Sequence, residues 1–265
     1  MIVVVSHSDA EILPVVRSGP VLGLVAQVVL LAGLGATVGL SEAAWLAGII
    51  SGAVVSTALT WGLDHSGAPG LGPADRVTLG RATLVGCVLA LVVDSYVRRV
   101  PVGLLVALAA VALVLDAVDG AVARRTGTVT PLGARFDMEV DAWLILVLSG
   151  YVAPRLGGWV LTIGAMRYAF VAAGWLLPWL EGPLPPRYWR KVVAAVQGVV
   201  LTVAAADVLP RPAMSIMLGA SLALLVESFG RDVRHLARHR PARPSTPATC
   251  PPLARPREDD VDVYG

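Results

Sequence analysis

Long uncharged and mostly apolar runs dominate the chain, and their apolar residues follow one another without alternation. Five such runs cover residues 18–41, 43–63, 101–115, 192–206 and 212–226. A helix that crosses a bilayer needs about 20 mostly apolar residues, so the first two runs reach this length by themselves. The others reach it only if charged residues lie at the ends of the spans. Because the runs are continuous, they predict helices rather than the alternating strands of a membrane β-barrel.

Eight hydrophobic segments follow from this pattern, and we expect an all-α, polytopic membrane helical bundle. The segments lie near residues 21–40, 43–61, 82–97, 101–124, 135–153, 158–180, 189–208 and 213–231. Gly and Pro residues between 64 and 73 separate the first two segments from the rest. The expected organisation is an N-terminal segment at 1–19, two extra transmembrane helices at 20–63, a six-span core at 73–240 and a disordered cytoplasmic tail at 241–265.

The beginning of the six-span core is more polar than the segment that follows it. Asp75, Arg76, Thr78 and Arg81 precede the apolar residues of the third segment. This pattern predicts an amphipathic helix near residues 73–81 that lies in the membrane interface and leads into a span. A polar loop is the alternative, since pattern alone separates the two poorly.

Composition excludes a soluble cytoplasmic enzyme and leaves an integral membrane protein. Hydrophobic residues make up 56% of the chain and charged residues 15%, against roughly 25% charged residues in an ordinary soluble domain. Basic residues gather at 76–81, 124–135, 187–191 and 231–243, which alternating spans place on one side. Positive residues favour the cytoplasmic side, so we expect both termini there. The sequence contains no nucleic-acid-binding motif.

The acidic residues between the fourth and fifth segments point to chemistry. They follow the pattern D-x-x-D-G-x-x-A-R-x8-G-x-x-x-D-x-x-x-D, with its aspartates at Asp116, Asp119, Asp137 and Asp141. The first two share one helix face and the last two share another, and antiparallel neighbouring helices would bring these faces together. Grouped carboxylates repel one another unless a cation is present. Oxygen ligands without His or Cys favour Mg²⁺ or Mn²⁺, and a pair of such ions suits phosphoryl transfer.

This pattern resembles the signature of the CDP-alcohol phosphatidyltransferases, and every specified residue and spacing is matched over residues 116–141. The resemblance covers roughly residues 73–240. It implies an integral membrane transferase of phospholipid biosynthesis, which moves a phosphatidyl-type group from a CDP-alcohol such as CDP-diacylglycerol to a hydroxyl acceptor and releases CMP. It also suggests a homodimer. We expect a multi-pass protein of the bacterial cell membrane with its active site facing the cytoplasm.

The resemblance implies a role for each matched residue. Asp116, Asp119 and Asp137 correspond to metal ligands, and Asp141 is a shared ligand or the base that takes the proton of the acceptor hydroxyl. The positions implied to bind the CDP moiety are Gly120, Ala123, Arg124 and Thr130. For Thr130 a capping or turn role is the alternative, because loop threonines commonly cap helices. The segment Asp75-x-x-Thr78-x-x-Arg81 is similar to a family segment that more often begins with Asn.

The acceptor's phosphate needs cations near the metal site. Arg167 lies in an otherwise apolar span, where a charge is costly unless it faces a polar cavity, although a helix-packing ion pair would also explain it. The other candidates are Arg187, Arg190 and Lys191. The stretch from Lys191 to Gln197 is similar to a pattern of phosphatidylglycerophosphate synthase-like members, without their Gly before the Lys. This favours glycerol 3-phosphate over an inositol phosphate.

Two other classes of function use the same residues differently. A divalent-cation transporter would bind its ion with the same carboxylates, but transport sites need polar groups along both halves of the membrane. A catalytically inactive membrane interaction module would retain the signature without turnover.

Overall fold

The computed structural model of the protein describes residues 18–66, 70–126, 130–181 and 188–238. Within these ranges, the side chains at positions 18, 119, 121–126, 178, 181 and 188 lie outside the description. Every regular element is helical in the described part of the chain. The α-helices are α1 (Ser18–Thr37), α2 (Glu42–Ser66), α3 (Pro73–Ser95), α4 (Val102–Thr126), α5 (Pro131–Leu156), α6 (Leu161–Leu176), α7 (Tyr188–Ala206) and α8 (Arg211–Arg238), and 3₁₀ turns cover Gly158–Val160 and Pro178–Glu181.

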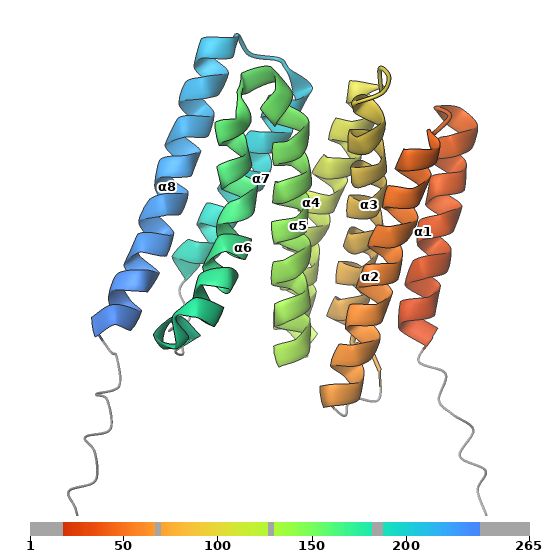
Figure 1. Cartoon of the computed structure of the whole chain (residues 1–265). Helices are drawn as coiled ribbons and strands as arrows, with labels where there is room; N and C mark the ends of the chain where they lie inside the picture. The colour runs from red at the N-terminus through yellow and green to blue at the C-terminus, as the bar shows by residue number, and fades with distance from the viewer. Residues whose placement is uncertain (1–17, 67–69, 127–129, 182–187, 239–265) are drawn as a thin grey trace, which may run out of the picture.

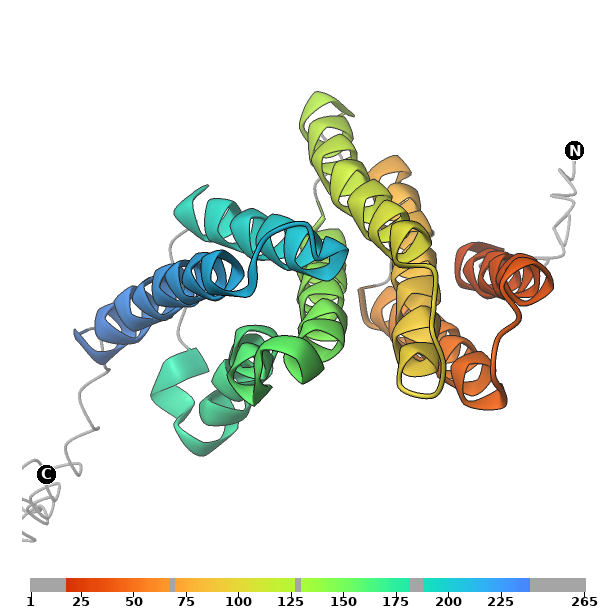
Figure 2. The same ribbon diagram turned by 90° about the horizontal axis from the view of Figure 1, so that it is seen from above.

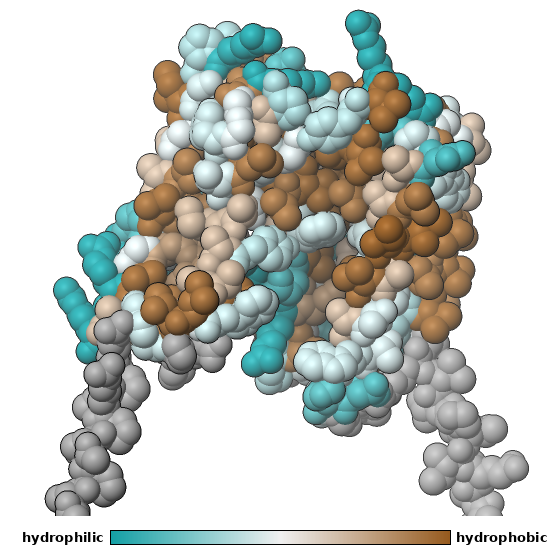
Figure 3. Space-filling model, in the orientation of Figure 1, coloured by the Kyte–Doolittle hydropathy of each residue, from teal (hydrophilic) through white to brown (hydrophobic). Residues whose placement is uncertain are grey.

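The helices run up and down beside one another as a bundle, which confirms the all-α membrane architecture predicted from the apolar runs (Figure 1). Among the described residues, six helices are long and apolar enough to cross a membrane: α1, α2, α3, α6 with its preceding 3₁₀ turn, α7 and α8. The apolar part of α4 is shorter and covers Val102–Val118. Apolar side chains cover much of the sides of the bundle, while hydrophilic ones gather towards its ends and in the lower centre of the face in Figure 3.

One end of the bundle collects the helix termini that matter for the site. The first residue of α1 and the last of α8 both lie there (Figure 1). So do the beginning of α3, the end of α4 and the beginning of α5. We call this the site end. At the opposite end, α5 stops at Gly157, whose φ of 109° lies in a region that glycine adopts readily.

Helix α3 forms the centre of the bundle, because it is covered from both sides. Its residues Val85, Val88 and Leu91 belong to a large apolar core shared with α4, α5, α7 and α8. Two other residues of α3, Cys87 and Ala90, pack against Leu31, Leu34 and Ala44 of α1 and α2. The first two helices thus lie beside α3, on the side away from α6 to α8 (Figure 2).

A buried carboxylate ties α1 and α2 to α3 at the end opposite the site. Asp94 is completely buried and accepts hydrogen bonds from the backbone N–H of Ser41, at 3.0 Å, and from Nε of Arg98, at 2.6 Å. The hydroxyl of Ser41 in turn accepts a bond from the backbone N–H of Ala44 at 3.3 Å and caps α2. The loop between α1 and α2 is therefore fastened to the end of α3 by charge-assisted bonds.

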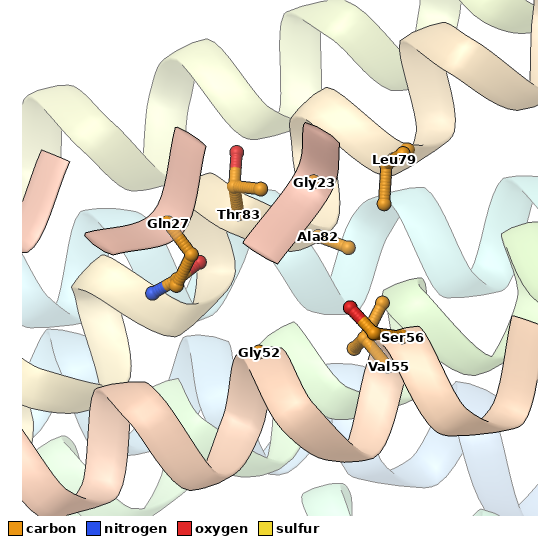
Figure 4. Close-up of a pocket in the computed structure, with 8 residues that line it drawn as sticks. All are labelled: Gly23, Gln27, Gly52, Val55, Ser56, Leu79, Ala82 and Thr83. Carbon is orange, nitrogen blue, oxygen red and sulfur yellow. The ribbon is translucent and has the colours of Figure 1, made fainter. Parts of the chain in front are cut away.

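The same three helices leave a small cavity between them (Figure 4). Gly23, Gln27, Gly52, Val55, Ser56, Leu79, Ala82 and Thr83 line it. Ser56 donates its hydroxyl proton to the carbonyl of Pro20 at 3.0 Å. Leu79, Ala82 and Thr83 lie on a different face of α3 from Arg81 at 100° per residue, so this cavity is distinct from the acidic site described below.

Residues 73–81, predicted to be an interfacial helix that leads into a span, do continue directly into the third span, and their placement in the membrane interface stays a prediction. These residues form the first turns of one continuous helix from Pro73 to Ser95, and Asp75, Thr78 and Arg81 are all buried in it. At least part of this polar pattern serves contacts inside the bundle. Arg81 projects towards carboxylates of neighbouring helices rather than towards lipid headgroups.

Candidate active site

Three of the four signature aspartates lie together between α4 and α5. Asp116 comes from α4, and Asp137 and Asp141 come from one face of α5. One carboxylate oxygen from each residue lies within 4.8 Å of the others. We call these three residues the carboxylate cluster. The backbone of Asp119 continues α4 one turn beyond Asp116, but its side chain lies outside the described residues.

A single arginine contacts all three members of the carboxylate cluster. Nη1 of Arg81 lies 2.8 Å from Oδ1 of Asp116 and 2.6 Å from Oδ1 of Asp137. Nη2 donates a hydrogen bond to Oδ1 of Asp141. The planar guanidinium, with its fork of N–H donors, suits this bridging of carboxylates on two helices. The sequence pattern includes Arg81 in a family-like segment but indicates no role for it, because the partners of Arg81 are 35 or more positions away.

The cluster lies well inside the bundle and not at a helix end. Asp141 is ten residues from the beginning of α5, and Asp116 is ten residues from the end of α4. At about 1.5 Å of rise per residue, both lie roughly 15 Å from the site end of their helices. Arg81 is only 1% exposed, whereas the side chains of Asp116, Asp137 and Asp141 are 33%, 29% and 25% exposed. The carboxylates are therefore accessible, and Arg81 lies behind them.

A close contact between α3 and α5 shapes the approach to the cluster. Asp75 is buried near the beginning of α3, and its Oδ2 accepts a hydrogen bond from the backbone N–H of Gly72 at 3.0 Å. Its Oδ1 lies against Gly133 so closely that a Cβ atom at that position would overlap it. The glycine of the signature is thus needed for close approach of a neighbouring side chain.

Thr130 caps α5. Its hydroxyl oxygen accepts a hydrogen bond from the backbone N–H of Gly133 at 2.9 Å, and the following Pro131 suits the first helical position. Thr130 therefore has the capping role that loop threonines commonly have, and its contact with the CDP moiety stays a prediction. Gly120 is half-buried in α4, while the side chains of Ala123 and Arg124 lie outside the described residues.

The candidate arginines for the acceptor phosphate contact acids outside the carboxylate cluster. Arg167 of α6 forms an ion pair with Glu139, which lies two residues from both Asp137 and Asp141 and so projects from another face of α5. The helix-packing ion pair considered for Arg167 is present. The acceptor role stays a prediction.

The basic residues at the beginning of α7 differ in their surroundings. Arg190 lies 3.8 Å from the nearly buried Asp232 of α8, measured from Nη1 to Oδ2. The side chain of Lys191 is exposed, and Arg187 lies outside the described residues. Gln197 is completely buried, and its Nε2 donates a hydrogen bond to the backbone carbonyl of Ser221 at 2.7 Å. This bond joins α7 to α8.

The carboxylate cluster has the properties of a site for a hard divalent cation. Its possible ligands are all oxygen atoms, they come within 4.8 Å of one another, and they are partly exposed. Mg²⁺ and Mn²⁺ prefer such ligands. The three residues of the carboxylate cluster therefore fit a metal ion, and a ligand role of Asp119 stays a prediction.

Comparison with known proteins agrees with this geometry. No curated protein and no solved structure matches the chain. The family model described as CDP-alcohol phosphatidyltransferase matches residues 72–226, which is more than half of the sequence. The match begins at the residue before α3, ends within α8 and contains the whole carboxylate cluster, so α1 and α2 lie outside it. The chain belongs to the CDP-alcohol phosphatidyltransferase family.

Proposed function

We propose that the protein transfers a phosphatidyl-type group from CDP-diacylglycerol to a hydroxyl acceptor and releases CMP. The observation that carries this proposal is the meeting of Asp116, Asp137 and Asp141, from two antiparallel helices, in a partly exposed position inside the bundle. Placing several carboxylates together in an apolar protein costs free energy unless cations balance their charges. Family membership supplies the class of reaction.

Asp116, Asp119 and Asp137 would hold divalent cations, with Asp141 as a shared ligand or the catalytic base. We propose two ions, either Mg²⁺ or Mn²⁺. When bound, these ions would neutralise the diphosphate and stabilise the charge that develops on the departing phosphate of CMP. The protein's own contribution is to fix the carboxylates on rigid helices, so that little reorganisation is needed during the reaction.

The group-transfer step uses Asp141 as a proton acceptor. The acceptor's hydroxyl oxygen forms a bond to the β-phosphorus of the CDP-lipid, while the bond between that phosphorus and the oxygen of CMP breaks. The hydroxyl proton passes to the Asp141 carboxylate, which is 25% exposed and can release it to solvent. Of the two oxygens of Asp141, Oδ1 contacts Arg81, so Oδ2 is the proposed proton acceptor.

The nucleotide would lie between the end of α4 and the beginning of α5. Gly120, Ala123 and Arg124 are the proposed CDP-binding residues of α4, and Thr130 is that of α5. The Thr130 hydroxyl uses its oxygen to cap α5, so its proton is still available to donate to a phosphate or ribose oxygen. The guanidinium of Arg124, five residues beyond Asp119 in the sequence, is a group that suits a diphosphate.

The acceptor would be glycerol 3-phosphate or an inositol phosphate, with its phosphate held by basic residues. Lys191 is the first candidate because its side chain is exposed, and Arg190 directly precedes it on α7. Arg187 precedes them in the sequence. Arg167 ranks after these residues, since it would have to leave Glu139 to reach a ligand.

The site end would face the cytoplasm of a bacterial cell, as the basic residues at the helix ends suggest. A homodimer is proposed from the family resemblance alone.

The test of the proposed function is a panel of acceptors added to purified protein with CDP-diacylglycerol and Mg²⁺ or Mn²⁺. The panel is glycerol 3-phosphate, inositol phosphate, inositol and serine. We expect CMP release with one phosphorylated acceptor. If no acceptor and neither metal supports CMP release by folded protein, the proposed function is wrong, and metal transport or an inactive module becomes the better account.

A further inference from the structure

Arg81 is the one described cation seen to contact every member of the carboxylate cluster, and it does so from the buried side. It occupies α3, whereas the acids occupy α4 and α5, so its guanidinium joins three helices. A guanidinium keeps its positive charge at any pH that a folded protein tolerates. Its contacts with the three carboxylates are therefore ionic as well as hydrogen-bonded.

The charges of these four side chains explain why such a residue is useful. Three carboxylates at this distance repel one another, and the low dielectric of an apolar bundle strengthens the repulsion. Arg81 offsets one of the three negative charges. The three carboxylates together keep a net negative charge, which attracts divalent cations. The cluster is thereby held together without being neutralised, so it keeps its attraction for a metal ion.

The buried position of Arg81 makes it costly for the side chain to move away from the carboxylates. Its side chain is 1% exposed, and α3 is covered on one side by α1 and α2 and on the other by the large apolar core. Its guanidinium stays near the carboxylates, and a metal ion held by Asp116, Asp137 and Asp141 has to share or take over the oxygen atoms that the arginine contacts.

We propose that Arg81 is a built-in counterion of the metal site. It holds the three carboxylates in place before a metal ion binds, and it competes with the metal for them afterwards. Metal loading is then an exchange of partners, and Arg81 sets the affinity of the site. The inference rests on the proposed function only in taking the same carboxylates as metal ligands. It assigns Arg81 a positioning role and no contact with the reacting atoms.

Competition between Arg81 and the metal predicts in which direction the metal affinity changes when Arg81 is replaced, and this affinity can be measured without enzyme turnover. Replacing Arg81 by Met removes the competing charge but keeps an unbranched side chain of similar length. The affinity for Mn²⁺ rises, by about tenfold or more, because one positive charge within hydrogen-bond distance of the ligands is lost. The melting temperature in a chelator falls, because three carboxylates lose their counterion. The increase in melting temperature on adding Mn²⁺ becomes larger than in the original protein.

The experiment uses the full chain, purified in detergent, with Mn²⁺ binding followed by electron paramagnetic resonance and stability by thermal unfolding. Arg76→Met is the matched control, because Arg76 lies on the same helix, is exposed and belongs to neither the cluster nor its contacts. We expect Arg76→Met to bind Mn²⁺ as the original protein does and Arg81→Met to bind it more tightly. Arg81→Gln, which is polar but uncharged, should behave as Arg81→Met does.

Equal or weaker Mn²⁺ binding by both Arg81 variants would overturn the inference. If the variants fold only when Mn²⁺ is present, the counterion role is supported, because the metal then replaces the arginine. If they fail to fold even with Mn²⁺, Arg81 is a structural residue and the inference is wrong. Parallel CMP assays of the original protein separate the two proposals: Mn²⁺ binding without CMP release contradicts the proposed function alone, while CMP release with unchanged Mn²⁺ affinity in the variants contradicts the counterion alone.

Discussion

Asp75 and Gly133 are in direct contact, although 58 positions separate them, and their contact joins the beginnings of α3 and α5. Oδ1 of Asp75 occupies the space that a Cβ atom on Gly133 would need. Asp75, at a position where the similar family segment more often has Asn, thus packs against a glycine of the signature. The contact lies on the site-end side of the carboxylate cluster, so it controls how closely α3 and α5 approach there.

Gly133→Ala should therefore destabilise the protein and reduce CMP release. The added methyl group overlaps a buried carboxylate, and such overpacking typically costs about 1–3 kcal/mol. Gly80→Ala is the control, because Gly80 lies on α3 with nothing within 4 Å of its Cβ position, and alanine favours a helix. Thermal unfolding measures both effects. The double variant Asp75→Ala, Gly133→Ala should recover part of the loss, and additive losses would show that the two residues do not interact.

Asp94→Ala should lower stability and leave the chemistry intact. The substitution leaves the backbone N–H of Ser41 and the exposed guanidinium of Arg98 without their shared acceptor, and loss of a buried hydrogen-bond acceptor typically costs about 1–3 kcal/mol. Asp94 lies at the end of the bundle opposite the site, so CMP release per folded molecule should be unchanged well below the melting temperature. A variant of normal stability that had lost activity would contradict this assignment.

Lys191→Met and Gln197→Leu should affect different properties, substrate binding and stability respectively, although the two residues lie only six positions apart. The exposed Lys191 is a proposed ligand of the acceptor phosphate, so its loss should raise the KM for the acceptor several-fold with little change in melting temperature. Gln197 is buried and bonded to Ser221, so its loss should lower the melting temperature, at a typical cost of about 1–3 kcal/mol, without changing that KM. A raised acceptor KM in folded Gln197→Leu would place this residue at the acceptor instead.

Metal removal should abolish CMP release reversibly. A chelator takes away the cations that the carboxylate cluster is proposed to hold, and added Mg²⁺ or Mn²⁺ should restore the rate. Asp116→Asn should shift the metal concentration needed for half-maximal rate upwards, because one of the ligands loses its charge. Full activity in a chelator would contradict the proposed metal dependence.

The helical architecture was predictable because a membrane bundle is encoded locally. Continuous apolar runs indicate helices wherever they occur, and their number and order need no knowledge of long-range contacts. The meeting of Asp116 with Asp137 and Asp141 was expected for a similar reason, since helical spacing and a short connection bring the two faces together. Asp119 and Arg124, which share this pattern, have side chains outside the described residues.

The partners of buried polar residues could not be predicted in the same way. The spacing of Asp75 and Arg81 is typical of an interfacial helix, and it carries no sign that α4 and α5 supply acids and a glycine on that side. Asp94 likewise reaches Ser41 across 53 positions. These contacts depend on how helices far apart in the sequence are packed, and a local pattern carries no information about that packing.

CMP release by the original protein and by Asp141→Asn tests the central claim most directly. The assay contains CDP-diacylglycerol, Mg²⁺ or Mn²⁺ and the acceptor that the panel identifies. Asp207→Asn serves as the control, because it makes the same substitution at an exposed acid of the opposite end. We predict CMP release at the same rate by the original protein and by Asp207→Asn, and none by folded Asp141→Asn. Undiminished CMP release by Asp141→Asn would contradict the account of the site.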